Sequence, residues 1–174
     1  MQRMNPARMQ CPVARSLEQV GEWWSILILR DAFLGLRRFE EFQQSLGIAP
    51  NMLTRRLVKL VDVGLLERHQ YGSHSRRFEY RLTEMGRNFR PVLLALLDWG
   101  NRHLAPEGKS IQLIDTQTGR EAQPLLIDEV TGLPMADPRF RVVAGPAASA
   151  RIKARYSPAG RSYDGRTAEE ARLP

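Results

Sequence analysis

Residues 37–64, RRFEEFQQSLGIAPNMLTRRLVKLVDVG, contain two helical patterns separated by a short turn. The first pattern predicts a short helix from Arg37 to Leu46, because the glycine that follows is a typical residue at the end of a helix. The second pattern begins near Pro50 and ends before Gly64. Its apolar residues recur at helical spacing along one face and are Leu53, Leu57, Leu60 and Val61. The spacing therefore predicts two consecutive amphipathic helices.

Hydrogen-bond donors line the opposite face of the second helix. They are Asn51, Thr54, Arg55, Arg56 and Lys59. An α-helix fits the major groove of DNA, where arginine pairs with guanine and asparagine with adenine through two hydrogen bonds each. We therefore predict that this face binds DNA, with some of the five residues contacting phosphate alone. The alternative is an ordinary solvated face.

A β-hairpin is predicted directly after the second helix. Its strands are LLERHQ, residues 65–70, and FEYRL, residues 78–82. The polar loop between them carries His74, Arg76 and Arg77. Two helices followed by a basic hairpin form a winged helix-turn-helix, in which the hairpin, or wing, reaches phosphates or the minor groove. The sequence thus predicts a mainly α fold with a small β-hairpin wing.

Helical patterns also flank this central segment. One long helix or two consecutive helices are predicted over residues 11–33, and a last helix follows the N-cap residue Thr83. Pro91 should kink or divide that last helix. The last helix is apolar on two sides, so we expect a homodimer to form through it. Five side chains are candidates for an effector pocket or a dimer core, although plain core is favoured: Trp23, Trp24, Phe89, Leu93 and Trp99.

The character of the chain changes after Ala105. Residues 1–105 are predicted to form the DNA-binding and dimerisation domain, and residues 106–156 a small β-rich extension. Within the extension, LIDTQTG at 113–119 recurs as LIDEVTG at 126–132, and each copy predicts a strand that enters a turn. A third strand is predicted at residues 140–143. Residues 157–174 contain few apolar residues, so we expect a disordered tail.

Charge and composition narrow the function further. The 174 residues carry a net charge of +7, of which residues 1–105 contribute +6, so double-stranded DNA is a fitting partner. The apolar runs are too short to span a membrane, and we expect a cytoplasmic protein. The single cysteine, Cys11, excludes an internal disulfide and a cysteine-based zinc fold.

Catalysis is not predicted. His69, His74 and His103 have no nearby carboxylate in the sequence and no metal-ligand spacing. We therefore expect neither an enzyme nor a bound cofactor or metal.

A set of residues spread over positions 11–104 follows the pattern of a known family. The set comprises Cys11-Pro12, Trp24, Ile26-Leu27-Ile28-Leu29-Arg30, Gly35, Arg37-Arg38-Phe39, Glu41-Phe42, Met52-Leu53-Thr54, Gly64-Leu65-Leu66, Glu79-Tyr80, Leu82-Thr83, Pro91-Val92 and Trp99-Gly100. With these residues the chain resembles the HxlR family of bacterial winged-helix transcription regulators. The resemblance implies a homodimer on an inverted-repeat operator, usually as a repressor. Some relatives sense oxidants or electrophiles through a cysteine at the position of Cys11, which makes it a candidate regulatory thiol. The alternative is that Cys11-Pro12 forms a buried helix start.

The extension has a resemblance of its own. Some longer family members end in a zinc-ribbon-like unit, and here Thr118, Asp128 and Thr131 stand where cysteines are expected. Threonine and carboxylate groups are poor zinc ligands beside four thiolates, so we expect no metal. The alternative to a regulator is a winged helix that serves as a ligand-binding or protein-interaction adaptor.

Overall fold

The computed structural model describes residues 10–71 and 77–156 of the chain. These residues form two compact units, which are described separately. The winged-helix unit comprises residues 12–124, and the C-terminal unit comprises residues 10–11 with 125–156. Composition predicts a boundary after Ala105, whereas the structure groups residues 106–124 with the winged-helix unit. No helix in the described residues is long and apolar enough to cross a membrane.

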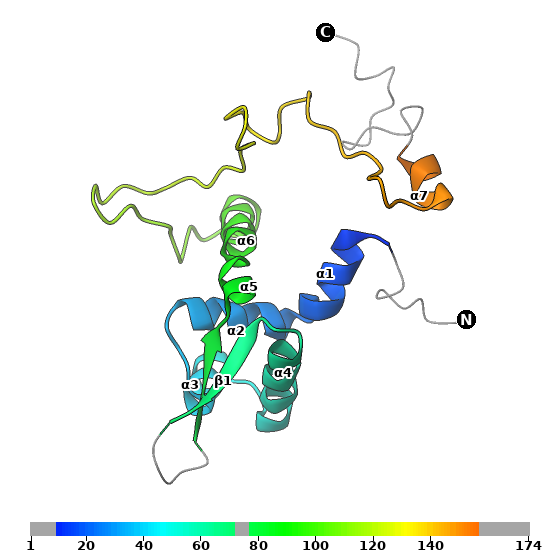
Figure 1. Cartoon of the computed structure of the whole chain (residues 1–174). Helices are drawn as coiled ribbons and strands as arrows, with labels where there is room; N and C mark the ends of the chain where they lie inside the picture. The colour runs from blue at the N-terminus through cyan, green and yellow to red at the C-terminus, as the bar shows by residue number, and fades with distance from the viewer. Residues whose placement is uncertain (1–9, 72–76, 157–174) are drawn as a thin grey trace. The chain divides into compact units, whose positions relative to one another are not determined.

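The winged-helix unit follows the predicted order of elements. In chain order they are α1 (Pro12–Val20), α2 (Trp23–Phe33), α3 (Phe39–Leu46), α4 (Pro50–Asp62), β1 (Leu66–Gln70), β2 (Phe78–Leu82), α5 (Glu84–Arg87) and α6 (Arg90–His103). Helices α5 and α6 lie on one side of α2, whereas α3, α4 and the hairpin lie on the other (Figure 1). The pattern over residues 11–33 is thus two helices. The last helix is divided near Pro91, as predicted, and this proline lies in the first turn of α6, where its missing N–H costs little.

Local signals set the ends of these elements. Gly47 adopts a left-handed conformation with φ of 61° and ends α3, as the sequence predicts. The Thr83 hydroxyl accepts a hydrogen bond from the Gly86 N–H at 3.0 Å, which confirms the predicted N-cap. The same hydroxyl donates to the Gly64 carbonyl at 2.5 Å. Thr83 therefore joins the start of α5 to the turn that follows α4.

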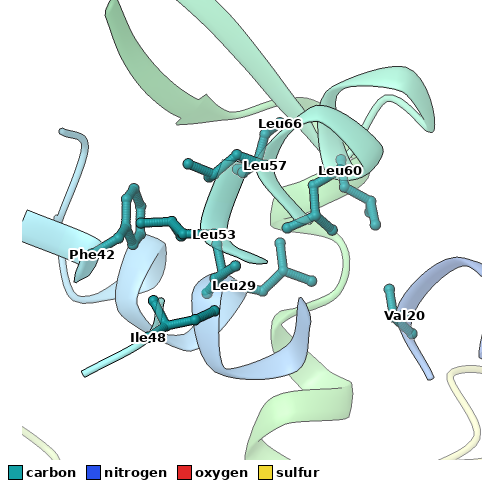
Figure 2. Packing of buried hydrophobic residues seen from close by; sticks show 10 residues of the cluster. Val20, Leu29, Phe42, Ile48, Leu53, Leu57, Leu60 and Leu66 are labelled. Atoms are coloured by element: carbon teal, nitrogen blue, oxygen red, sulfur yellow. The ribbon is translucent and has the colours of Figure 1, made fainter. Parts of the chain in front are cut away.

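The core of the winged-helix unit lies where α2, α3 and α4 meet the hairpin. Figure 2 shows buried side chains of these elements pointing toward one another. The predicted apolar face of α4 is confirmed, since Leu53, Leu57 and Leu60 have no exposed surface. The other buried members of the cluster are Val20, Ile28, Leu29, Phe42, Ile48, Leu65 and Leu66. This packing fixes the rotation of α4 about its own axis.

Strands β1 and β2 pair antiparallel, as predicted, with Leu66 opposite Leu82 and Gln70 opposite Phe78. The segment before α3 adds to the edge of β2, because the Tyr80 N–H donates to the Arg37 carbonyl at 2.8 Å. The start of α3 is thereby held beside the wing. Residues 72–76 at the wing tip lie outside the described part of the chain.

The extension is less β-rich than the sequence predicts. Its two repeated segments form isolated bridges, Ile114 with Glu121 in the winged-helix unit and Ile127 with Pro134 in the C-terminal unit, rather than strands. The strand predicted at residues 140–143 is absent, and a short helix, α7 (Ala150–Arg155), follows instead. No residue from 106 to 156 is buried, so a strand there has no apolar layer to pack against.

Each repeated segment nevertheless closes a turn through its own side chains. The Asp115 carboxylate accepts hydrogen bonds from the Gln117 N–H at 2.9 Å and the Thr118 hydroxyl at 2.8 Å. The Asp128 carboxylate accepts from the hydroxyl of Thr131 at 2.7 Å and from its N–H at 2.8 Å. These bonds stabilise the ionised form and lower the pKa of both carboxyls. The three residues that stand at expected zinc-ribbon cysteine positions, Thr118, Asp128 and Thr131, thus take part with Asp115 in hydrogen bonds that close the two turns.

Candidate nucleic-acid interface

The exposed side of α4 carries most of the predicted DNA-binding residues. Asn51, Thr54 and Arg55 are exposed, and Lys59 is half-buried in the last turn. Their positions follow from the buried leucines of the same helix, since residues that alternate with a buried stripe must face outward. We call Asn51, Thr54, Arg55 and Lys59 the DNA-reading face, after the role that the sequence predicts for them. The sequence predicts its existence, and the structure brings these four residues onto one helix surface.

Two members of the DNA-reading face have local contacts. The Thr54 hydroxyl donates to the Pro50 carbonyl at 2.9 Å, so it stays close to the helix backbone. The Arg55 Nη2 lies 3.9 Å from the Met52 sulfur, a weak contact. Among the described residues the Arg55 guanidinium has no carboxylate partner, and its donors are available for another molecule.

Arg56 differs from its neighbours on α4. Its Nη2 lies 2.9 Å from the Glu22 Oε2 in the segment between α1 and α2, and its side chain is only 21% exposed. Its Nε is buried and has no hydrogen-bond partner. A step of one residue rotates the side chain by about 100° around the helix. Arg56 is therefore the one predicted donor of α4 that the structure places apart from the DNA-reading face.

The wing contributes basic residues that the sequence predicts and others that it misses. His74 and Arg76 lie outside the described residues, whereas Arg77 is exposed immediately before β2. The sequence prediction omits Arg38 and Arg68. The Arg38 guanidinium lies 5.0 Å from the ring centre of Tyr71, and that of Arg68 lies 4.1 Å from the ring centre of Phe78. These cation–π contacts hold two positive charges at the base of the wing.

The start of α3 is capped by a glutamate and is bridged to β2 of the wing through Arg38 and Glu79. The Glu41 carboxylate accepts hydrogen bonds from the backbone N–H groups of Arg37 at 2.8 Å and Arg38 at 2.9 Å. These bonds lower the pKa of Glu41. The capping carboxylate satisfies two backbone N–H groups directly before the helix and holds the backbone at Arg38. The signal in the sequence is a glutamate three residues after the N-cap position.

A surface cavity of about 360 Å³ lies between the end of α2 and the sheet. Its wall includes Arg37, Arg81, Arg87 and Tyr80. Burial raises the pKa of the Tyr80 hydroxyl, while the positive charge of Arg68 acts in the opposite direction. Glu67 also lines the cavity, and the Arg81 Nη2 lies 3.0 Å from the Glu79 Oε2, so the positive charge of the wall is partly neutralised.

The five candidate pocket residues do not line a common pocket in the described part of the chain. Trp24, Phe89 and Leu93 pack against the core, whereas Trp23 is 59% and Trp99 53% exposed. The rings of Trp23 and Trp24 stack with centroids 3.7 Å apart. Within the described residues, Trp24, Phe89 and Leu93 therefore belong to the core. The two exposed indoles, Trp23 and Trp99, lie on the surface of α2 and α6.

His69, His103 and Cys11 lie at the surface or close to it. The expectation that His69 has no nearby carboxylate is wrong, since its Nε2 lies 2.9 Å from the Glu67 Oε1. The two residues are alternate members of β1 and share one face of the strand. Cys11 is half-buried directly before α1 and is not in a disulfide. No group of three or more His, Cys, Asp or Glu residues that fits a metal ion occurs in the described ranges.

Known proteins that are similar to this chain are helix-turn-helix regulators, in agreement with the fold described above. The family of HxlR-like helix-turn-helix proteins matches residues 19–108, which include α2 to α6. The chain is 42% identical over 141 residues to the uncharacterized HTH-type transcriptional regulator Rv3095 of Mycobacterium tuberculosis, covering 80% of this chain and 89% of the relative. That alignment is longer than residues 1–124, so it includes part of the C-terminal unit.

Two solved structures extend the likeness. The structure of PA1374 from Pseudomonas aeruginosa, a proposed transcription factor, is 52% identical with a TM-score of 0.61, covering 83% of this chain and 99% of that one. The redox regulator HypR in its reduced form is 32% identical with a TM-score of 0.51, covering 56% of this chain and 98% of that one. Family membership explains the hydrogen-bond donors on α4, the basic residues of the wing and the match over more than half of the sequence. The chain belongs to the HxlR family of helix-turn-helix transcriptional regulators, which bind DNA and are not enzymes.

Proposed function

We propose that this regulator is a cytoplasmic homodimer that binds an inverted-repeat operator and represses transcription. The observation that carries the proposal is the DNA-reading face of α4, which three fully buried leucines hold outward. A helix oriented by its core presents its donors in a fixed register, and such pre-organisation favours base contacts in the major groove.

The contacts divide by chemistry. Asn51 and Arg55 have the two-donor or donor–acceptor groups that pair with base edges, whereas Lys59 suits phosphate. The Thr54 hydroxyl would donate to phosphate after releasing the Pro50 carbonyl. In the wing, His74, Arg76 and Arg77 would contact the backbone or the minor groove. Arg38 and Arg68 at the base of the wing support them, because phosphate neutralisation depends on positive charge rather than on base identity.

Dimerisation is supported by the surface of α6. None of its fourteen residues is buried in the single chain. Val92, Leu96 and Trp99 are each about half exposed, and in α1 Val13 and Leu17 are exposed as well. Large apolar side chains gathered on two helices are typical of a surface that a second subunit covers. A two-fold dimer presents two copies of α4, which suits an inverted repeat.

The test is a titration of the full-length protein with its own upstream intergenic DNA and with a scrambled duplex, at two salt concentrations. We expect preferential, salt-sensitive binding of the upstream fragment. Arg55→Ala should reduce discrimination at one base pair by about 1–3 kcal/mol, whereas Arg77→Ala should weaken binding to both duplexes alike. Equal weak binding to both duplexes, unchanged by either substitution, would contradict the proposal and favour an adaptor that binds a ligand or a protein.

A second candidate role is redox regulation through Cys11. The similarity to the redox regulator HypR supports it, as does the place of this half-buried thiol at the start of α1. Because the chain has one cysteine, peroxide would join two protomers through a Cys11–Cys11 disulfide or form a mixed disulfide with a small thiol. We expect peroxide to change DNA affinity in the wild type and not in Cys11→Ser. Identical responses of the two proteins would exclude this role.

A further inference from the structure

Charge is segregated along the last part of the chain. Residues 106–138 contain six acidic and two basic residues. Residues 139–156 contain no acidic residue, and their five basic residues are Arg139, Arg141, Arg151, Lys153 and Arg155. All five are exposed. We call residues 139–156 the basic segment, and it lies wholly within the C-terminal unit.

The acidic residues of the C-terminal unit do not neutralise the basic segment. Asp128 is engaged by the N–H and the hydroxyl of Thr131. Asp137 accepts a hydrogen bond from the Arg139 N–H at 2.9 Å, and the Arg139 Nε lies 3.6 Å from the same carboxylate oxygen. Among the described residues Arg141, Arg151 and Lys153 form no ion pair. Of the five basic residues of the segment, Arg139 alone therefore has an ion pair among the described residues.

Helix α7 presents part of this charge in an ordered way. The Ser149 N–H before the helix donates to the Gln10 side-chain oxygen at 3.0 Å. Ile152 and Tyr156 are four residues apart and half-buried, whereas Arg151 and Arg155 are four residues apart and exposed. Residues at this spacing share one side of a helix. Ile152 is thus on a half-buried side of α7, whereas Arg151 and Arg155 are exposed, and the Arg155 guanidinium lies 5.9 Å from the ring centre of Tyr156.

We propose that the basic segment is a second DNA-binding surface, which contacts phosphates of the duplex that the winged-helix unit holds. The proposal rests on the proposed function, since α4 and the wing bring the duplex to the chain. Once that duplex is bound, the basic segment meets it as a tethered group at a high effective concentration. Exposed arginine and lysine without base-reading geometry supply affinity and not base preference.

The test compares two full-length double variants that each remove two exposed positive charges. Arg151→Gln/Arg155→Gln changes the basic segment, and Arg90→Gln/Arg120→Gln is the control outside it. Each phosphate contact contributes about 0.9 to the slope of log affinity against log salt, which is about 3.5-fold in affinity between 50 and 200 mM salt. We expect the first variant to lose about 1.8 of this slope for each bound protomer and the control to keep the wild-type slope.

The base preference of the first variant should match that of the wild type when the upstream and scrambled duplexes are compared. A slope equal to that of the control would overturn the proposal. A change in sedimentation with an unchanged slope would also overturn it, because the segment would then bind a second copy of the chain. Failure of the proposed function would give a different result from failure of this inference. Arg55→Ala would then have no effect on base preference in the wild type, the double variant or the control.

Discussion

At the scale of single residues, two adjacent side chains of α4 differ in burial, and we expect them to differ in their contribution to stability. Leu57 has no exposed surface, whereas Val58 beside it is 49% exposed. Leu57→Ala removes packed methyl groups from the core and should lower the free energy of unfolding by about 2–5 kcal/mol. Val58→Ala should change it by less than about 0.5 kcal/mol. Urea denaturation of both variants measures the difference, and equal losses would contradict the position of α4 in the core.

Arg56 illustrates the limit of sequence reasoning at the same scale. Helical spacing places it near the DNA-reading face, but no periodicity reveals that Glu22, more than thirty positions earlier, lies 2.9 Å from its guanidinium. A long, flexible side chain such as arginine adopts the conformation that reaches a tertiary partner. Sequence alone therefore predicts the face and its residues, but it also assigns Arg56 to that face because the ion pair with Glu22 cannot be predicted from spacing.

The Glu22–Arg56 pair makes a testable distinction between a structural and a DNA-reading role. Because Glu22 is largely exposed, we expect a coupling free energy below about 1 kcal/mol in a double-mutant cycle of Glu22→Gln and Arg56→Gln. Thermal denaturation at low and high salt measures it, and salt should weaken the coupling. Arg56→Gln should also retain the operator base preference. Loss of that preference comparable to the effect of Arg55→Ala would return Arg56 to the DNA-reading face.

At the scale of elements, α5 approaches the start of the hairpin so closely that one position requires glycine. A Cβ added at Gly86 would overlap the backbone carbonyl of Leu65, which cannot move aside without shifting β1. Gly86→Ala should therefore destabilise the protein, despite the higher helix propensity of alanine. Gly100 in α6 has open space around the same position, and Gly100→Ala should gain about 0.4–1 kcal/mol. Opposite shifts in melting temperature are expected, and a stabilising Gly86→Ala would disprove the close approach.

The Asp128 turn should depend on pH in a defined direction. Its hydrogen bonds lower the pKa below the model-compound value of 3.8, so they stabilise the turn when the carboxyl is ionised. This stabilisation is complete above the unfolded pKa and is lost as pH falls through the lower folded pKa. Protection of the Thr131 amide from hydrogen exchange should decrease in that range. Glu129→Gln is the control, and protection that persists at lower pH would show that the carboxylate does not close the turn.

The elements of the winged-helix unit were predictable because each has a local signal. Amphipathic spacing indicates α4, Gly47 ends α3, and Thr83 caps α5. The strand predicted at residues 140–143 fails for a physical reason. Alternation of apolar and polar residues favours a strand only where another strand and an apolar layer exist, and the extension offers neither.

At the scale of the whole molecule, the proposed homodimer depends on the exposed apolar surface of α6 and α1. Fourteen residues of α6 without one buried side chain leave Val92, Leu96 and Trp99 in contact with water in a single chain. A subunit interface that covers them gains roughly 25 cal/mol for each square ångström of apolar surface removed from water. We therefore expect α6 to be more stable in the proposed dimer than in a single chain.

Leu96→Glu places a charge in the middle of this surface and should convert a dimer into a monomer, because the buried carboxylate would lack a partner. Arg90→Glu, at the exposed start of the same helix, is the control and should remain dimeric. Sedimentation velocity measures the change. The monomeric variant should also lose most of its affinity for a two-half-site operator while keeping a folded α4, since two tethered recognition helices bind far more tightly than one. A Leu96→Glu protein that sediments like the control would place the dimer contact elsewhere on the chain.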